Sequence, residues 1–156
     1  MQTTRRQRRK IGKSARSGVA AVEAAIVIPL FLVLFLGAVD AGQFANCYQK
    51  VSDASREGAR TAARFGTSDV SSVETAVLDY LGDMFPGVSE STLSSAVQVT
   101  VRNSGGAITG SNLGSTSTGS QVAVEVSLQF DSVRWISGLQ ILGGWNVQAT
   151  AMMRRE

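Results

Sequence analysis

The sequence contains no histidine and one cysteine, and aromatic residues make up only 6% of its 156 residues. Histidine is the usual base near neutral pH and the commonest metal ligand, so its absence disfavours most acid–base and zinc chemistry. One cysteine cannot form a disulfide within the chain. Acidic residues outside the predicted helices are sparse and unpaired. We therefore expect no catalysis, no metal or other cofactor, and no small-molecule substrate.

Basic residues are concentrated at the N-terminus. Residues 1–18 contain seven of them and no acidic residue, whereas the remaining 138 residues contain eight basic and twelve acidic ones. The net charge of +3 therefore reflects a short basic leader. The rest of the chain lacks the positive charge that a nucleic-acid-binding surface needs, so we expect no nucleic-acid partner.

An apolar run follows the leader directly. Residues 19–39 contain one charged residue, Glu23, and as a helix they would span about 32 Å, the thickness of a bilayer core. A buried core helix is the alternative, but sixteen consecutive uncharged residues beside a basic leader favour a transmembrane helix over residues 19–40. Because the basic residues precede the run, the leader is predicted to be cytoplasmic and the residues after Asp40 extracytoplasmic.

A cleaved secretory signal is the competing interpretation of the same residues. Its apolar region would be residues 24–39, with cleavage after the small residue Ala41 and before Gly42. The run is long for such a signal, and Glu23 stands at its entrance, where a secretory signal has no use for an acid. The product would be a secreted or membrane-tethered extracytoplasmic binding module.

The residues around Glu23 resemble the N-terminus of type IV prepilins, in which a glycine precedes the cleavage site and a glutamate is the fifth residue after it. Gly18 and Glu23 occupy these positions. Within that superfamily the chain is most similar to the TadE-like family of tight-adherence (Flp) pilus systems. The likeness rests on Gly-Val-Ala-Ala-Val-Glu at 18–23, on Ser-Arg-Glu-Gly-Ala-Arg at 55–60 and, more loosely, on the last eight residues.

This resemblance implies a minor pseudopilin that acts in the assembly or anchoring of a tight-adherence pilus, and so in surface adhesion. A prepilin peptidase would cut between Gly18 and Val19. The other expected partners are pilin-like subunits, membrane assembly proteins and the lipid bilayer. The expected location is the inner membrane, crossed once, with the C-terminal domain in the periplasm or outside the cell, or within the pilus.

Physical reasoning also makes Glu23 a functional candidate. A carboxylate in lipid costs several kcal/mol unless it is paired. After cleavage, the new α-amino group of Val19 would be a cation four residues away, on the same helix or on a neighbouring one, and assembly could neutralise both charges. The alternative is a Glu23 side chain that reaches back to the cytoplasmic interface.

The helical pattern continues beyond the membrane, and residues 41–66 are predicted to extend the same helix to about Phe65. Ala54, Gly58 and Ala62 recur at four-residue spacing, which would let a second helix or a sheet approach closely; an ordinary alanine-rich helix composition is the alternative. Cys47 is interpreted as a small buried apolar residue, with an intermolecular disulfide as the other possibility.

Residues 67–156 are predicted to form a small domain, which makes the whole chain a pilin-like α+β protein. Ser71 and Glu74 suggest a capping box that opens a second helix, which Pro86 closes. Alternating apolar residues predict three antiparallel strands, at 97–102, 121–130 and 145–153. Residues 104–120 are rich in glycine, serine and threonine and predict a flexible loop.

The segment 132–143 carries large apolar side chains in a glycine-rich context, and its pattern leaves two interpretations open. The side chains belong either to the core or to a surface patch that contacts a partner. The residues concerned are Trp135, Ile136, Leu139, Ile141 and Leu142.

Overall fold

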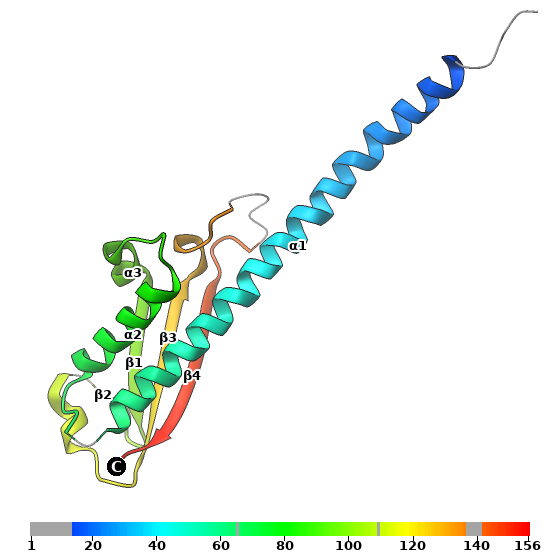
Figure 1. Ribbon diagram of the computed structural model, residues 1–156. Helices are drawn as coiled ribbons and strands as arrows, with labels where there is room; N and C mark the ends of the chain where they lie inside the picture. Colours follow the sequence, from blue (N-terminus) through cyan, green and yellow to red (C-terminus); the bar gives the residue numbers. More distant parts are fainter. Residues whose placement is uncertain (1–13, 65, 109, 137–141) are drawn as a thin grey trace, which may run out of the picture.

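The computed structural model describes residues 14–64, 66–108, 110–136 and 142–156. One helix, α1 (Ser14–Ala63), projects far beyond a small head domain in which its outer half is embedded (Figure 1). The head domain also contains α2 (Val70–Met84), α3 (Glu90–Ala96) and the strands β1 (Val97–Asn103), β2 (Gly106–Ile108), β3 (Gln121–Gln129) and β4 (Asn146–Arg154). The α+β prediction, with a long N-terminal apolar helix, is confirmed.

The four strands form one antiparallel sheet in the order β2-β1-β3-β4. Both α1 and α2 lie on the same face of this sheet (Figure 1). The strand β3 shows why, because its side chains alternate strictly and one face of it is fully buried, as expected for a sheet covered on one side. The buried residues of β3 are Val122, Val124, Val126 and Leu128.

The sheet has four strands, where the sequence predicts three. The additional strand, β2, lies within the segment 104–120 and pairs with β1, with Val101 opposite Ile108. A two-residue connection, Ser104–Gly105, joins the two strands, and the Asn103 side-chain oxygen accepts a hydrogen bond of 2.9 Å from the Gly105 N–H. A 3₁₀ turn at Gly110–Ser115 follows and buries Leu113 completely.

The helix boundaries also differ in detail from the sequence-based expectation. The N-cap of α2 is Asp69, so the predicted capping box is wrong, and Ser71 and Glu74 are exposed residues inside the helix. The helix α3 was not predicted from the sequence. Its N-cap Ser89 accepts a hydrogen bond from the Thr92 N–H. The first helix ends at Ala63, just before the predicted end, and Phe65 lies outside the described residues.

The C-terminus is fastened to the end of α1 that lies farthest from the N-terminal projection (Figure 1). The Glu156 N–H donates to the Ala63 carbonyl at 2.9 Å. The buried guanidinium of Arg155 donates to the Leu113 carbonyl at 2.6 Å and to the Thr67 carbonyl at 2.8 Å. These bonds tie the C-terminus to the end of α1 and to the segments around Thr67 and Leu113.

Candidate functional site

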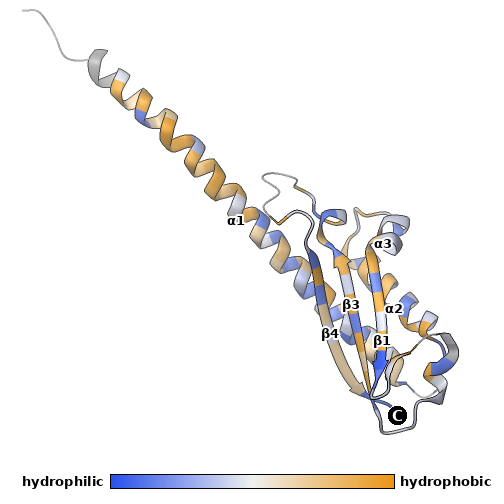
Figure 2. Cartoon of the chain, turned by 180° about the vertical axis from the view of Figure 1, so that it is seen from behind, coloured by the Kyte–Doolittle hydropathy of each residue, from blue (hydrophilic) through white to orange (hydrophobic). Residues whose placement is uncertain are grey.

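The most unusual surface of the protein is the part of α1 that projects from the head domain, residues 18–39, which we call the stem. None of its most apolar stretch is buried inside the molecule. Most of its large side chains are exposed, and Leu34 is still 65% exposed near the end that joins the head domain. Figure 2 colours most of the stem as hydrophobic. A monomer in water does not expose an apolar surface of this length. The stem is therefore a candidate membrane span, and it fits a single-pass membrane protein.

Gly18, Val19 and Glu23 all lie on the exposed stem. A side chain at Gly18 would meet nothing within 4 Å, and Val19 is 70% exposed. Since Val19 and Glu23 are four residues apart in a continuous helix, they lie on the same face, about 6 Å apart along the helix axis. The head domain covers none of the three.

The stem ends where the segment after β3 begins to cover α1. Asp40 is only 5% exposed, and its Oδ2 atom accepts a hydrogen bond from the Leu142 N–H at 3.1 Å. One turn further along α1, Oε1 of Gln43 accepts from the N–H groups of Trp135, at 3.2 Å, and Ile136, at 3.3 Å. Two side chains of α1 thus hold the backbone of this segment against the helix at the base of the stem.

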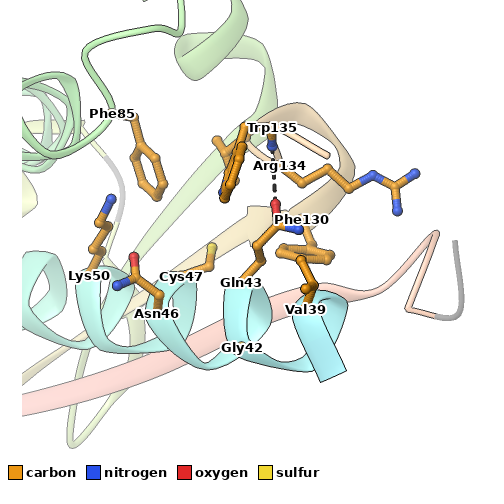
Figure 3. Close-up of a pocket in the computed structure, with 11 residues that line it drawn as sticks. Val39, Gly42, Gln43, Asn46, Cys47, Lys50, Phe85, Phe130, Arg134 and Trp135 are labelled. Carbon is orange, nitrogen blue, oxygen red and sulfur yellow. Dashed lines mark hydrogen bonds between the residues drawn. The ribbon is translucent and has the colours of Figure 1, made fainter. Parts of the chain in front are cut away.

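A cavity of about 400 Å³ opens beside these contacts (Figure 3). Its walls come from α1, from Phe85 at the end of α2 and from the residues around Trp135. Lys50 lies at one side, with its ammonium 4.2 Å from the centre of the Phe85 ring and a hydrogen bond of 2.8 Å to the Met84 carbonyl. The cavity lining is Val39, Gly42, Gln43, Asn46, Cys47, Lys50, Phe85, Phe130, Val133, Arg134 and Trp135.

The one nucleophile of the cavity, Cys47, is poorly suited to chemistry. Its side chain is 2% exposed, and burial raises the pKa of the thiol from 9.0 to about 11, although the nearby Lys50 ammonium opposes part of the rise. The thiol is therefore protonated at neutral pH and not reactive. Within the described ranges, no group of three or more acidic, cysteine or histidine side chains could hold a metal ion.

The small residues Ala54, Gly58 and Ala62 lie in the core of the head domain, where α1 meets α2 and the sheet. A Cβ atom at Gly58 would come within 2.7 Å of Cγ2 of Val77 on α2 and within 3.1 Å of Cγ1 of Val124 on β3. Real Cβ atoms do not approach so closely, so glycine at this position sets the separation of α1 from both neighbours.

The structure divides the predicted patch at 132–143. Leu142 packs against the core, Ile136 is half-buried, and Trp135 is 79% exposed. Leu139 and Ile141 lie outside the described residues.

One residue near this patch was not singled out by the sequence reading. Trp145, just before β4, is 58% exposed, and its ring stands edge-on to Phe44 with the ring centres 6.3 Å apart. Its position at the start of a predicted strand concealed it, because a strand pattern identifies only the inward or outward face.

Comparison with known proteins agrees with this arrangement of stem and head. A search of curated proteins and a search of solved structures give no significant match to the chain. The family model described as TadE-like protein matches residues 18–60, which cover the stem and nearly all of the embedded part of α1. This match confirms the resemblance to the TadE-like family and indicates a protein related to Tad pili with an N-terminal apolar helix.

Proposed function

We propose that the protein is a non-enzymatic pseudopilin that is anchored in the inner membrane by its stem and acts in assembling or anchoring a tight-adherence pilus. Adhesion to surfaces would be the outcome of that activity. The observation that carries the proposal is the exposed apolar stem within the TadE-like match, because none of its most apolar stretch is buried. A stem of this kind needs either lipid or the stems of other subunits around it, and pilus assembly offers both.

In this proposal a prepilin peptidase removes the basic leader by cutting between Gly18 and Val19. The absence of a side chain at Gly18 and the open space around it support access to that bond. Cleavage leaves an α-amino group on Val19, on the same helix face as Glu23. The carboxylate then pairs with the amine of its own or a neighbouring subunit, which offsets the cost of both charges in lipid.

The contacts of Asp40 argue against secretory cleavage before Gly42. That cut would separate Asp40 from the mature domain, although its carboxylate is buried and bonded to the Leu142 N–H. A buried backbone donor would lose its partner, at a cost of about 1–3 kcal/mol. The head domain uses the residue that a secretory cut would discard.

The test is N-terminal sequencing of the protein purified from membranes after co-expression with a prepilin peptidase, using two matched variants. The variant Gly18→Val blocks the proposed site, and Ala41→Leu removes the small residue that a secretory site needs. We expect Val19 as the first residue in the wild type and in Ala41→Leu, and a full-length precursor in Gly18→Val. A mature Gly18→Val protein, or a precursor that accumulates only in Ala41→Leu, would contradict the proposal.

A further inference from the structure

We infer that the end of the head domain next to the stem, which we call its base, is itself a membrane-binding surface. There Trp135 and Trp145 enter the headgroup layer of the bilayer beside the stem. The inference rests on the membrane anchoring of the stem proposed above. It adds that the head domain lies against the lipid surface, in a fixed orientation, and does not hang freely from the helix.

The exposure of the two tryptophans is the first observation. They are the only tryptophans of the chain, and they are 79% and 58% exposed although tryptophan is highly buried on average. Both contact α1 just beyond the stem, Trp135 through its backbone N–H bond to Gln43 and Trp145 through its ring contact with Phe44. Tryptophan is enriched where a protein meets the interface between lipid and water, because its ring is apolar and its N–H is polar.

The depth of these residues is fixed by their contacts with α1. The Trp135 N–H is bonded to Gln43, and the Trp145 ring packs against Phe44. Gln43 and Phe44 follow the last apolar stem residue, Val39, by four and five residues, which corresponds to about 6–8 Å along the helix. The headgroup layer on each side of the hydrocarbon core has a similar thickness. If the apolar stem fills the core, both indole rings are at headgroup depth.

The stem and Trp135 also meet at one cavity. Val39, the last residue of the stem, and Trp135 line the same cavity, which Figure 3 shows. The backbone bonds from Gln43 and Asp40 hold this segment in place, so the rings are presented without a large further loss of conformational freedom. Because this segment lies directly beside the end of the apolar stem, lipid is favoured as the occupant over a second copy of the head domain.

The experiment uses the two tryptophans as depth probes in the full-length protein, reconstituted in phosphatidylcholine vesicles. Trp135→Phe leaves Trp145 as the only fluorophore, and Trp145→Phe leaves Trp135. The vesicles contain a minor fraction of lipid with a nitroxide quencher either on the headgroup or deep in the acyl chain. We expect the fluorescence of each tryptophan to be quenched at least about twofold more by the headgroup nitroxide than by the deep nitroxide, since indole rings settle at the interface.

A control variant places a tryptophan at the opposite end of the head domain. In the Trp135→Phe/Trp145→Phe background, Met152→Trp puts the probe on a 69% exposed position of β4, roughly 23 Å along the strand from Trp145. Neither nitroxide should quench this probe.

Three results would overturn the inference. If the protein floats with the vesicles but headgroup nitroxide quenches Trp135 and Trp145 no more than Met152→Trp, the head domain does not touch the membrane, although the stem is inserted. If quenching by lipid is absent and the emission shifts only at high protein-to-lipid ratio, the surface binds a second copy. If the protein does not float, both the membrane stem and this inference are wrong.

Discussion

Asp40 and Leu142 are 102 residues apart in the sequence, yet the side chain of the first accepts a hydrogen bond from the backbone of the second at 3.1 Å. This bond lies at the boundary between the exposed stem and the head domain. Among the described residues, no stem residue makes a hydrogen bond to a distant part of the chain. It therefore marks the residue of α1 at which the folded domain begins.

Replacing Asp40 should destabilise the head domain at the end next to the stem. In Asp40→Ala the Leu142 N–H loses its acceptor, and we expect the free energy of unfolding to fall by about 1–3 kcal/mol. Asp40→Asn keeps an oxygen at the same position and should lose less. Chemical unfolding in detergent micelles measures both, and equal losses for the two variants would show that the hydrogen bond is not the cause.

Adding one methyl group at Gly58 should destabilise the core. A Cβ atom there would lie 2.7 Å from Val77 and 3.1 Å from Val124, so Gly58→Ala forces α1 away from α2 and β3 at a cost of about 1–3 kcal/mol. The matched control is Gly82→Ala on α2, where a Cβ meets nothing within 4 Å and the better helix propensity of alanine should add about 0.5–1 kcal/mol. The midpoint temperature of thermal unfolding should fall for Gly58→Ala and rise for Gly82→Ala.

The stability of the head domain should depend on Cys47 at high pH. Burial raises the pKa of this thiol from 9.0 to about 11, so the unfolded chain loses the proton at lower pH than the folded one. The protonated thiol therefore makes its full contribution to the stability of the folded state below about pH 9, and this contribution is lost as the pH rises towards 11. The difference in pH dependence between the wild type and Cys47→Ala isolates this contribution.

The same residue gives a second, simpler measurement. A thiol reagent at neutral pH should modify Cys47 in the unfolded protein and leave it intact in the folded one, because the side chain is 2% exposed. Rapid modification of the folded protein, or a disulfide-linked dimer on a non-reducing gel, would contradict the buried environment.

Glu23 should matter for association more than for insertion. Glu23→Gln removes the charge that we propose pairs with the Val19 amine and also lowers the cost of entering lipid, so the protein should insert normally but co-purify poorly with pilin-like partners. Glu23→Asp keeps the charge on a shorter side chain and should fall between. Ala24→Gln adds the same amide while keeping the acid, and it should associate normally. Normal association of Glu23→Gln would leave Glu23 as an interfacial residue without a partner.

The long-range architecture followed from strong, repeated signals in the sequence. The long apolar run and the three- and four-residue spacing beyond it predicted α1, and the alternation of apolar residues predicted β1, β3 and β4. The elements that were not predicted, β2 and α3, are short. The strand β2 has three residues, too few to show a period, although the pair Ser104–Gly105 after a strand is a recognisable hairpin connection.

The sequence reading also erred where a polar residue had several possible roles. Several cap-forming residues precede or open α2, among them Ser68, Asp69 and Ser71. The structure uses Asp69, so that Val70 and Val73 are buried in the core. The contacts at the base of the head domain could not be predicted from the sequence for a related reason. The bonds from Asp40 and Gln43 join residues about a hundred positions apart, and no local pattern encodes such a pair.

The unbroken course of α1 has a mechanical consequence. A pull on the stem travels along one helix to Ala63, at the end of the head domain farthest from the stem, where the Glu156 N–H is bonded to the Ala63 carbonyl. The sheet packs along the side of this helix, so the load acts in shear on many contacts at once and does not peel them apart one by one. A protein built in this way can bear tension along the axis of α1 without unfolding from one end.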